Sequence, residues 1–140
     1  LLTLHAFMTE AIQLPNRHAT LRLVPMPKDT NAAGDIFGGW IMSQVDIAGS
    51  IAASRRAKGR VVTVAVNAFS FKAPVFVNDV VSFYAEVKKV GTTSLTVNVE
   101  VYVERGLRWP NPGEVVKVTE AVLTYVAVDE NRQKRTVPPA

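Results

Sequence analysis

The spacing of apolar residues changes along the chain from a helical period to a period of two. Residues 38–57 are apolar on nearly every side and end in a basic cluster followed by Gly59, which predicts one long, largely buried helix. Four segments after Gly59 are rich in Val, Thr, Tyr and Phe and predict strands at 61–71, 80–90, 92–105 and 114–129. A shorter alternating segment, 18–24, predicts a fifth strand ahead of the helix.

The short connections favour an antiparallel sheet, with a tight hairpin at Gly91 between the second and third of the four late strands. The predicted fold class is therefore α+β, a five-stranded antiparallel sheet wrapped around one long central helix. The 140 residues suffice for one domain over 1–140. Residues 1–17 and 132–140 are expected to be peripheral tails, and we expect the second to be loosely held.

The predicted helix has an apolar surface wider than a single stripe. One side carries Ile41, Val45, Ala48 and Ala52, and the surface is broadened by Trp40, Ile47 and Ile51. We therefore expect the helix to be covered on more than one side.

Asp46 is the only carboxylate between residues 39 and 54, a stretch that has no Lys or Arg. Its helix face is small and partly polar, formed by Gly39, Met42, Ser43, Gly49, Ser50 and Ala53. Burying a charge without a partner is costly unless a ligand compensates. Asp46 is thus a candidate functional acid; the alternative is a solvated or structurally paired residue.

Gly38 and Gly39 stand at the expected start of the helix, where free N–H groups lie at the positive end of the helix dipole. Such groups can polarise a carbonyl and stabilise an oxyanion, although a tight turn would also explain the glycines. Gly38 and Asp46 are separated by about 12 Å along a helix, so one carbonyl cannot contact both within a subunit. Two antiparallel helices related by a two-fold axis would bring them together, so such a site requires a dimer.

Composition narrows the possible chemistry. The chain has no cysteine and 2 histidines, which excludes disulfides and thiol catalysis, argues against a metal site and fits a reducing cytoplasm. The net charge of +4 favours an anionic ligand, but the basic residues are dispersed, so nucleic-acid binding is not expected. No apolar run is long enough to span a membrane.

The segments MPKDTNAAGDIFGGWIMSQVDIAG (26–49) and GRVVTVAV (59–66) resemble the hotdog-fold acyl-CoA thioesterases, and among them the YciA-type acyl-CoA thioester hydrolases. The resemblance extends from about Thr20 to Pro138. It implies hydrolysis of an acyl-CoA to a free acid and coenzyme A, without a separate cofactor, because coenzyme A is part of substrate and product. It also implies sites between paired subunits, in a cytoplasmic homodimer or a larger homo-oligomer such as a hexamer built as a trimer of dimers.

Several site residues follow from the resemblance. It assigns Asp46 as general base or nucleophile and Gly38 or Gly39 as the oxyanion donor. It also places Asp35 in the catalytic loop, with Asn31 beside it as a substrate contact. An acid just before a helix is also a common cap, which is the alternative for Asp35.

Coenzyme A carries phosphates, so basic residues are candidates for binding it. By resemblance, Thr63 and Val64 line the pantetheine arm. Arg60, which matches the family segment, and Lys72 are candidate phosphate contacts. Arg55, Arg56 and Lys58 are further candidates, which can instead complement the helix dipole.

Two other functions within this fold class stay open. A non-catalytic acyl-CoA-binding module would have no use for an isolated acid at the thioester. A hotdog dehydratase would need a histidine near the helix start, and neither His5 nor His18 is placed for that. A serine hydrolase is excluded by the absence of a G-x-S-x-G motif.

Overall fold

The computed structural model describes residues 12–106 and 113–140 and confirms the predicted α+β class. Its elements are β1 (Leu21–Leu23), the short 3-10 helix η1 (Pro27–Asp29), α2 (Gly38–Ala57), β2 (Val61–Phe71), β3 (Val80–Val90), β4 (Ser94–Arg105) and β5 (Glu114–Ala127). The helix bounds match the prediction, while η1 lies in the segment expected to be a loop.

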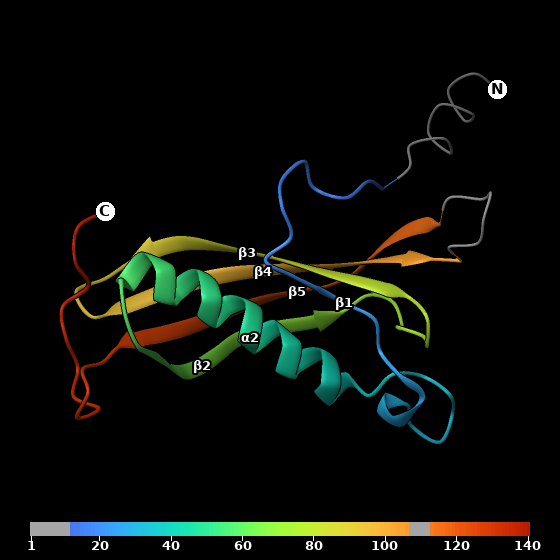
Figure 1. Cartoon of the computed structure of the whole chain (residues 1–140), viewed down its shortest axis with the longest axis horizontal. Coiled ribbons are helices and arrows are strands. Elements are labelled where there is room, and N and C mark those ends of the chain that lie inside the picture. The colour runs from blue at the N-terminus through green and yellow to red at the C-terminus, as the bar shows by residue number, and fades with distance from the viewer. Residues whose placement is uncertain (1–11, 107–112) are drawn as a thin grey trace.

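The strands form one antiparallel sheet in the order β1-β3-β4-β5-β2 (Figure 1). The tight hairpin between β3 and β4 is confirmed, since the Gly91 N–H donates to the Ser94 carbonyl at 2.8 Å. β1 is shorter than expected, because only Leu21–Leu23 pair with β3 before Pro25 ends the segment. In the part of the chain that the structure describes, β2 lies at one edge and pairs only with β5.

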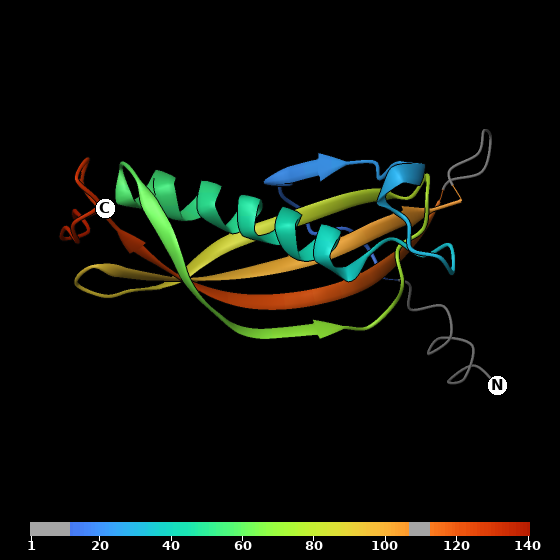
Figure 2. The ribbon, with the colours of Figure 1, turned by 90° about the horizontal axis from the view of Figure 1, so that it is seen from below.

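The helix α2 lies along one face of the curved sheet, and the core fills the space between them (Figure 2). Ile41 and Val45 from α2 pack in one cluster with inward-facing strand residues such as Phe83, Val99 and Leu123, all buried. Burying a side chain of this size contributes about 1.5–3 kcal/mol relative to leaving it exposed. This packing fixes the orientation of the helix on the sheet.

The expectation that α2 is covered on more than one side is wrong for the single chain. Ile47 is 44% exposed and Met42 is 41% exposed, because the sheet covers only one side of the helix. The remaining apolar surface of α2 is open to another molecule.

The tail 132–140 was expected to be loosely held, and this is also wrong. Val137 is buried, and its N–H donates to the Thr92 carbonyl at 2.8 Å. The Arg56 side chain donates to the Pro138 carbonyl at 2.6 Å. Arg135 donates to backbone carbonyls of three different segments, so the tail closes one end of the molecule.

Candidate active site

Asp46 lies in the middle of α2, partly buried, and faces β2 and β5. Its Oδ1 atom accepts a hydrogen bond from the Thr63 hydroxyl at 2.7 Å and another from the Tyr125 hydroxyl at 2.9 Å. Thr63 and Tyr125 face each other as partners on the two neighbouring strands. Asp46 forms no ion pair within the described ranges, so its partners inside the chain are two neutral hydroxyl groups.

Tyr125 is a contact of Asp46 that the sequence reasoning missed. The side chain is fully buried, and its hydroxyl also lies 2.9 Å from the Asp46 backbone carbonyl. Burial, and then the hydrogen bond to Asp46, raise the pKa of Tyr125 well above its ordinary value. The tyrosine is therefore a neutral hydrogen-bond donor over the whole pH range of an enzyme assay.

Gly49 explains the small helix face beside Asp46. A Cβ atom at Gly49 would overlap the Tyr125 hydroxyl, so only glycine permits the approach of the ring to the helix. The sequence signal that could have indicated this contact is a glycine one helical turn after the acid, together with an inward-facing aromatic residue on β5. Sequence spacing alone does not set the register between the helix and the strand.

The strand β2 is irregular beside Asp46. Its pairing with β5 shifts between Thr63 and Ala65, which leaves Val64 as an extra residue that is 54% exposed. Bulges of this kind redirect side chains and are frequent next to active sites. Here the irregularity follows directly after the threonine that donates to Asp46.

The N-terminal end of α2 forms a second group of candidate residues. Gly38 and Gly39 are its first residues, and Phe37 at the N-cap makes no side-chain capping bond. Among the described residues, neither glycine N–H has a backbone or side-chain acceptor. The alternative interpretation of Asp35 as the cap of this helix is therefore wrong.

A pocket of about 400 Å³ opens at this end of the helix. Its walls are Asn31, Asp35, Ile36, Gly38, Ile41, Phe71, Ala73, Pro74 and Val75. Asn31 shapes the loop beside it, because its Oδ1 accepts the N–H groups of Ala33 at 2.9 Å and Asp35 at 3.1 Å. The structure thus brings three predicted residues, Asn31, Asp35 and Gly38, to one pocket whose other walls are apolar.

The two groups do not meet within one chain. Gly38 and Asp46 are separated by eight residues of regular helix, which corresponds to about 12 Å. A single carbonyl group could contact both only if one of them came from another copy of the chain.

The basic candidates do not form one site. Arg60 precedes β2 and lines a separate pocket of about 490 Å³, whereas Lys72 follows β2 and lies 3.6 Å from Glu120. The 11 residues of β2 lie between these two residues, and a regular strand of that length spans roughly 35 Å. Arg56 and Lys58 instead donate to the carbonyls of Pro138 and Pro139 in the tail.

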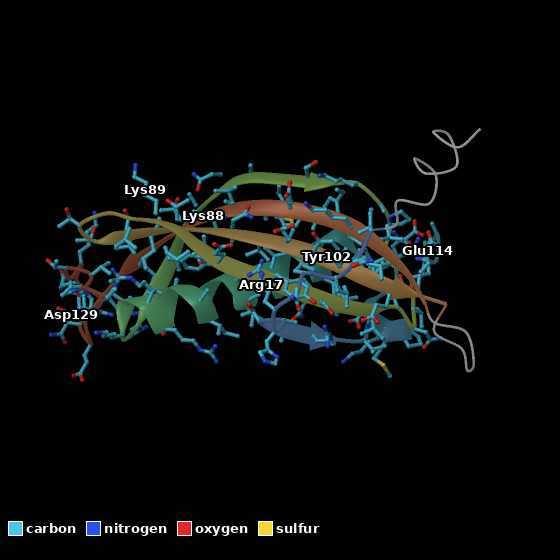
Figure 3. The ribbon with its side chains drawn as sticks, turned by 90° about the horizontal axis from the view of Figure 1, so that it is seen from above. Arg17, Lys88, Lys89, Tyr102, Glu114 and Asp129 are labelled. Atoms are coloured by element: carbon cyan, nitrogen blue, oxygen red, sulfur yellow. The ribbon has the colours of Figure 1, made fainter. Side chains whose placement is uncertain are left out.

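Another charged cluster lies on the opposite face of the sheet (Figure 3). The Tyr102 hydroxyl donates to Glu100 at 2.7 Å, and Lys117 lies 3.2 Å from the same carboxylate. Burial, and then the bond to Glu100, raise the pKa of Tyr102 to about 12. This cluster stabilises the outer sheet face and is separated from Asp46 by the sheet.

The described residues contain no group of three or more acidic, histidine or cysteine side chains that could hold a metal ion. Within those ranges, no helix combines the length and apolar character needed to cross a bilayer.

Comparison with known proteins places this chain in a family. Residues 33–109 match the thioesterase superfamily. The acyl-CoA thioester hydrolase YciA of Salmonella typhimurium is 50% identical over 131 residues, which are 94% of this chain and 98% of that protein. A hexameric thioesterase from Yersinia pestis is 50% identical, with a TM-score of 0.83 over 91% of this chain and 100% of that one. A hexameric hotdog-fold thioesterase of Campylobacter jejuni is 44% identical, with a TM-score of 0.81 over 86% and 90% of the two chains.

The chain belongs to the thioesterase superfamily and, within it, to the hotdog-fold acyl-CoA thioester hydrolases.

Proposed function

We propose that this protein hydrolyses acyl-CoA thioesters to a free acid and coenzyme A, with Asp46 as general base or nucleophile. The observation that carries the proposal is the arrangement of the Asp46 carboxylate in a member of this family. One oxygen, Oδ1, is held by two hydroxyl donors, while among the described residues no group donates to the other, Oδ2. Oδ2 is therefore available to a water molecule or a thioester carbon.

The reaction needs only the thioester and water. In the general-base form, Asp46 takes a proton from water while the new C–O bond forms at the thioester carbon. The tetrahedral oxyanion then collapses, the C–S bond breaks, and the sulfur of coenzyme A leaves with a proton. In the nucleophilic form, the carboxylate attacks first and water hydrolyses the resulting mixed anhydride. Neither form uses a cofactor, because coenzyme A enters as part of the substrate.

The oxyanion would be stabilised by the N–H groups of Gly38 or Gly39 from a second subunit. These donors lie at the positive end of the α2 dipole and are free for a ligand. Asp35 and Asn31 line the pocket beside Gly38, so we propose that they contact the acyl end of the substrate there.

A homodimer is the smallest assembly that this chemistry allows. The edge strand β2 exposes Val64 (54%) and Val66 (47%), and α2 exposes Ile47 and Met42 beside the uncovered side of the helix. An open strand edge with exposed apolar residues is suited to a second copy of the chain. The relatives from Yersinia pestis and Campylobacter jejuni are named as hexameric, and we propose a hexamer built as a trimer of dimers here.

Coenzyme A would be bound by residues along β2. We propose that Thr63 and the bulged Val64 contact the pantetheine arm, because Thr63 donates to Asp46 and Val64 follows it directly. Arg60 and Lys72 lie at opposite ends of β2, so at most one of them can contact the phosphates of a given coenzyme A from the same subunit. The absence of cysteine supports a cytoplasmic enzyme.

The proposed function is tested by measuring free thiol released from acyl-CoA substrates of several chain lengths. Wild type should release thiol, and Asp46→Asn should lose about 10²- to 10⁴-fold in kcat/KM, the range of a general base. Ser50→Ala is the matched control, because it alters the same helix face one turn away. Among the described residues, the Ser50 hydroxyl bonds only to the Ile47 carbonyl.

Two results would overturn the proposal in different ways. If wild type binds acyl-CoA but releases no thiol, the protein is a binding module of the kind considered from the sequence. If Asp46→Asn keeps full turnover with an unchanged melting temperature, the assigned role of Asp46 is wrong. A hydratase assay with an enoyl-CoA distinguishes the dehydratase alternative from thioester hydrolysis. That alternative needs a histidine near the helix start, and among the described residues His18 forms no hydrogen bond with Asp46 or Gly38.

A further inference from the structure

We propose that Tyr125 is a positioning residue for Asp46. Gly49, which has no side chain, leaves the space beside the helix that the Tyr125 hydroxyl occupies. This inference rests on the proposed function and concerns how the carboxylate is held during turnover. It is carried by three contacts: the hydroxyl to Asp46 Oδ1, the hydroxyl to the Asp46 backbone carbonyl, and the ring against Gly49.

The two donors to Oδ1 differ in how firmly they are held. Tyr125 is fully buried in the core cluster between α2 and the sheet, so its ring has no freedom to leave. Thr63 is exposed on the edge strand β2. Tyr125 is therefore the fixed support, whereas the Thr63 hydroxyl can turn toward a bound substrate.

The single proton of the Tyr125 hydroxyl has two acceptors at 2.9 Å. The Asp46 carbonyl belongs to the helix, where the ordinary acceptor pattern pairs it with the N–H four residues later. Hydrogen bonds to an ionised acceptor are roughly twice as strong as bonds between neutral groups. The stronger of the two hydrogen bonds from Tyr125 therefore goes to the carboxylate, where it occupies Oδ1.

Occupation of Oδ1 has a consequence for the chemistry. A carboxylate with one fixed oxygen presents the other, here Oδ2, in a single direction. Without the tyrosine hydroxyl, the carboxylate can rotate and the two oxygens become interchangeable. Small displacements of a reacting group lower the rate of the chemical step by up to about 10²-fold.

Gly49 supports this interpretation independently. Glycine in the middle of a helix is unfavourable by about 1 kcal/mol relative to alanine. Alanine at this position would place its Cβ on the tyrosine hydroxyl, and its distance to Tyr125 Cζ would be 3.1 Å. Glycine, the unfavourable residue, therefore stands where the Tyr125 hydroxyl lies against the helix.

The test compares kcat and KM for Tyr125→Phe with those for Tyr84→Phe in the intact oligomer. We expect Tyr125→Phe to lower kcat by about 10- to 100-fold with KM changed less than about twofold, because only the carboxylate geometry changes. Tyr84 is a matched control: it is also buried, its hydroxyl also has a partner, Arg22, and that partner lies outside the site. Tyr84→Phe should keep the wild-type kcat.

A second pair of variants separates positioning from a general loss of packing. Gly49→Ala should lower kcat in the wild-type background by displacing the hydroxyl, and should lower it much less in the Tyr125→Phe background, where no hydroxyl remains. This non-additivity is expected of residues that act through one contact. If Tyr125→Phe does not fold, Gly49→Ala alone carries the test, since it retains the tyrosine.

The outcomes distinguish this inference from the proposed function. If Asp46→Asn is inactive and Tyr125→Phe keeps the wild-type kcat, Tyr125 does not position the carboxylate and the proposed function stands. If Tyr125→Phe and Tyr84→Phe lower kcat equally, the effect is one of packing and the inference is wrong. If wild type releases no thiol at all, the proposed function and this inference both fail.

Discussion

The two ends of α2 are built in opposite ways. At the N-terminal end, Phe37 provides no side-chain cap and the N–H groups of Gly38 and Gly39 have no described acceptor. At the C-terminal end, the N–H groups of Lys58 and Gly59 donate to the Ser54 carbonyl. Arg135 from the tail donates there as well, to the Ala57 carbonyl at 2.9 Å.

This difference suits a helix whose C-terminal end contributes stability and whose N-terminal end serves the proposed function. Helices leave four unpaired groups at each end, and side-chain caps typically contribute about 1 kcal/mol. The C-terminal end is closed by its own chain, which fixes the helix on the sheet. The N-terminal end lacks that stabilisation and keeps its donors free, as the proposed oxyanion site requires.

The largest expected effect is removal of one donor at the open end. Gly38→Pro deletes a single N–H, and proline is well tolerated at the first helical position. Phe37 has ψ of 135°, which suits a residue before proline. We expect kcat to fall by about 10²- to 10³-fold, as measured by thiol release at saturating substrate.

Gly38→Ala is the control for that variant. It adds the same Cβ, 3.2 Å from Phe71 Cζ, but keeps the N–H. Its kcat should stay within a few fold of wild type. Equal rates for the alanine and proline variants would show that the N–H of Gly38 is not an oxyanion donor.

At the closed end, the expected effect is on stability. Arg135→Ala removes the side-chain donor of the Ala57 and Val128 carbonyls. The Arg60 carbonyl keeps the Val128 N–H as a donor at 3.0 Å. We expect the free energy of unfolding to fall by about 2 kcal/mol, measured by denaturant unfolding at fixed protein concentration. The exposed neighbour Lys134 provides the control, since Lys134→Ala should change stability by less than about 0.5 kcal/mol. A large fall in kcat of the folded Arg135→Ala protein, with little change in its free energy of unfolding, would contradict the division between the two ends.

A smaller effect is expected when the open end is given a cap. Phe37→Ser supplies a hydroxyl that can accept from the free N–H groups, so stability should rise by about 1 kcal/mol. The same hydroxyl competes with the substrate oxygen, so kcat should fall several fold. Thermal unfolding and the thiol assay on one preparation check both. A variant that is more stable and equally active would show that the open end has no catalytic use.

The smallest expected effect is at the C-cap. Lys58 has φ of 54°, a left-handed conformation that glycine adopts more easily. Lys58→Gly should raise the free energy of unfolding by about 0.5–1 kcal/mol and leave kcat unchanged. A fall in stability would mean that the bond from Lys58 to Pro139 matters more than the backbone conformation.

Local patterns predicted the helix 38–57, the strand 61–71 and the Gly91 hairpin, because helical or strand periodicity and glycine punctuation are properties of neighbouring residues. The same patterns located Asp46 as an acid without a nearby cation. They did not find Tyr125, which contacts Asp46 across 79 positions of sequence. That contact depends on the register between a helix and a strand, which no local period determines.

The remaining misses have the same origin. No local pattern in the tail 132–140 indicates its attachment, because its partners lie far away in sequence, as the bond across 82 positions between Arg56 and Pro138 illustrates. Ile47 was expected to be covered, because an apolar side chain does not reveal whether its own sheet or another copy of the chain covers it. Arg60 and Lys72 are both candidates for binding coenzyme A because of their charge, but the length of β2 separates them.

The central claim is that Asp46 and the N–H of Gly38 in one active site come from different subunits. The most direct measurement is thiol release by mixed oligomers, formed by co-expressing equal amounts of Asp46→Asn and Gly38→Pro chains, each nearly inactive alone. If the site spans two subunits, random pairing leaves about a quarter of the sites with both groups intact, and about a quarter of the wild-type activity returns. If mixed oligomers are no more active than the two variants prepared separately, both groups are needed from the same chain and the claim is contradicted.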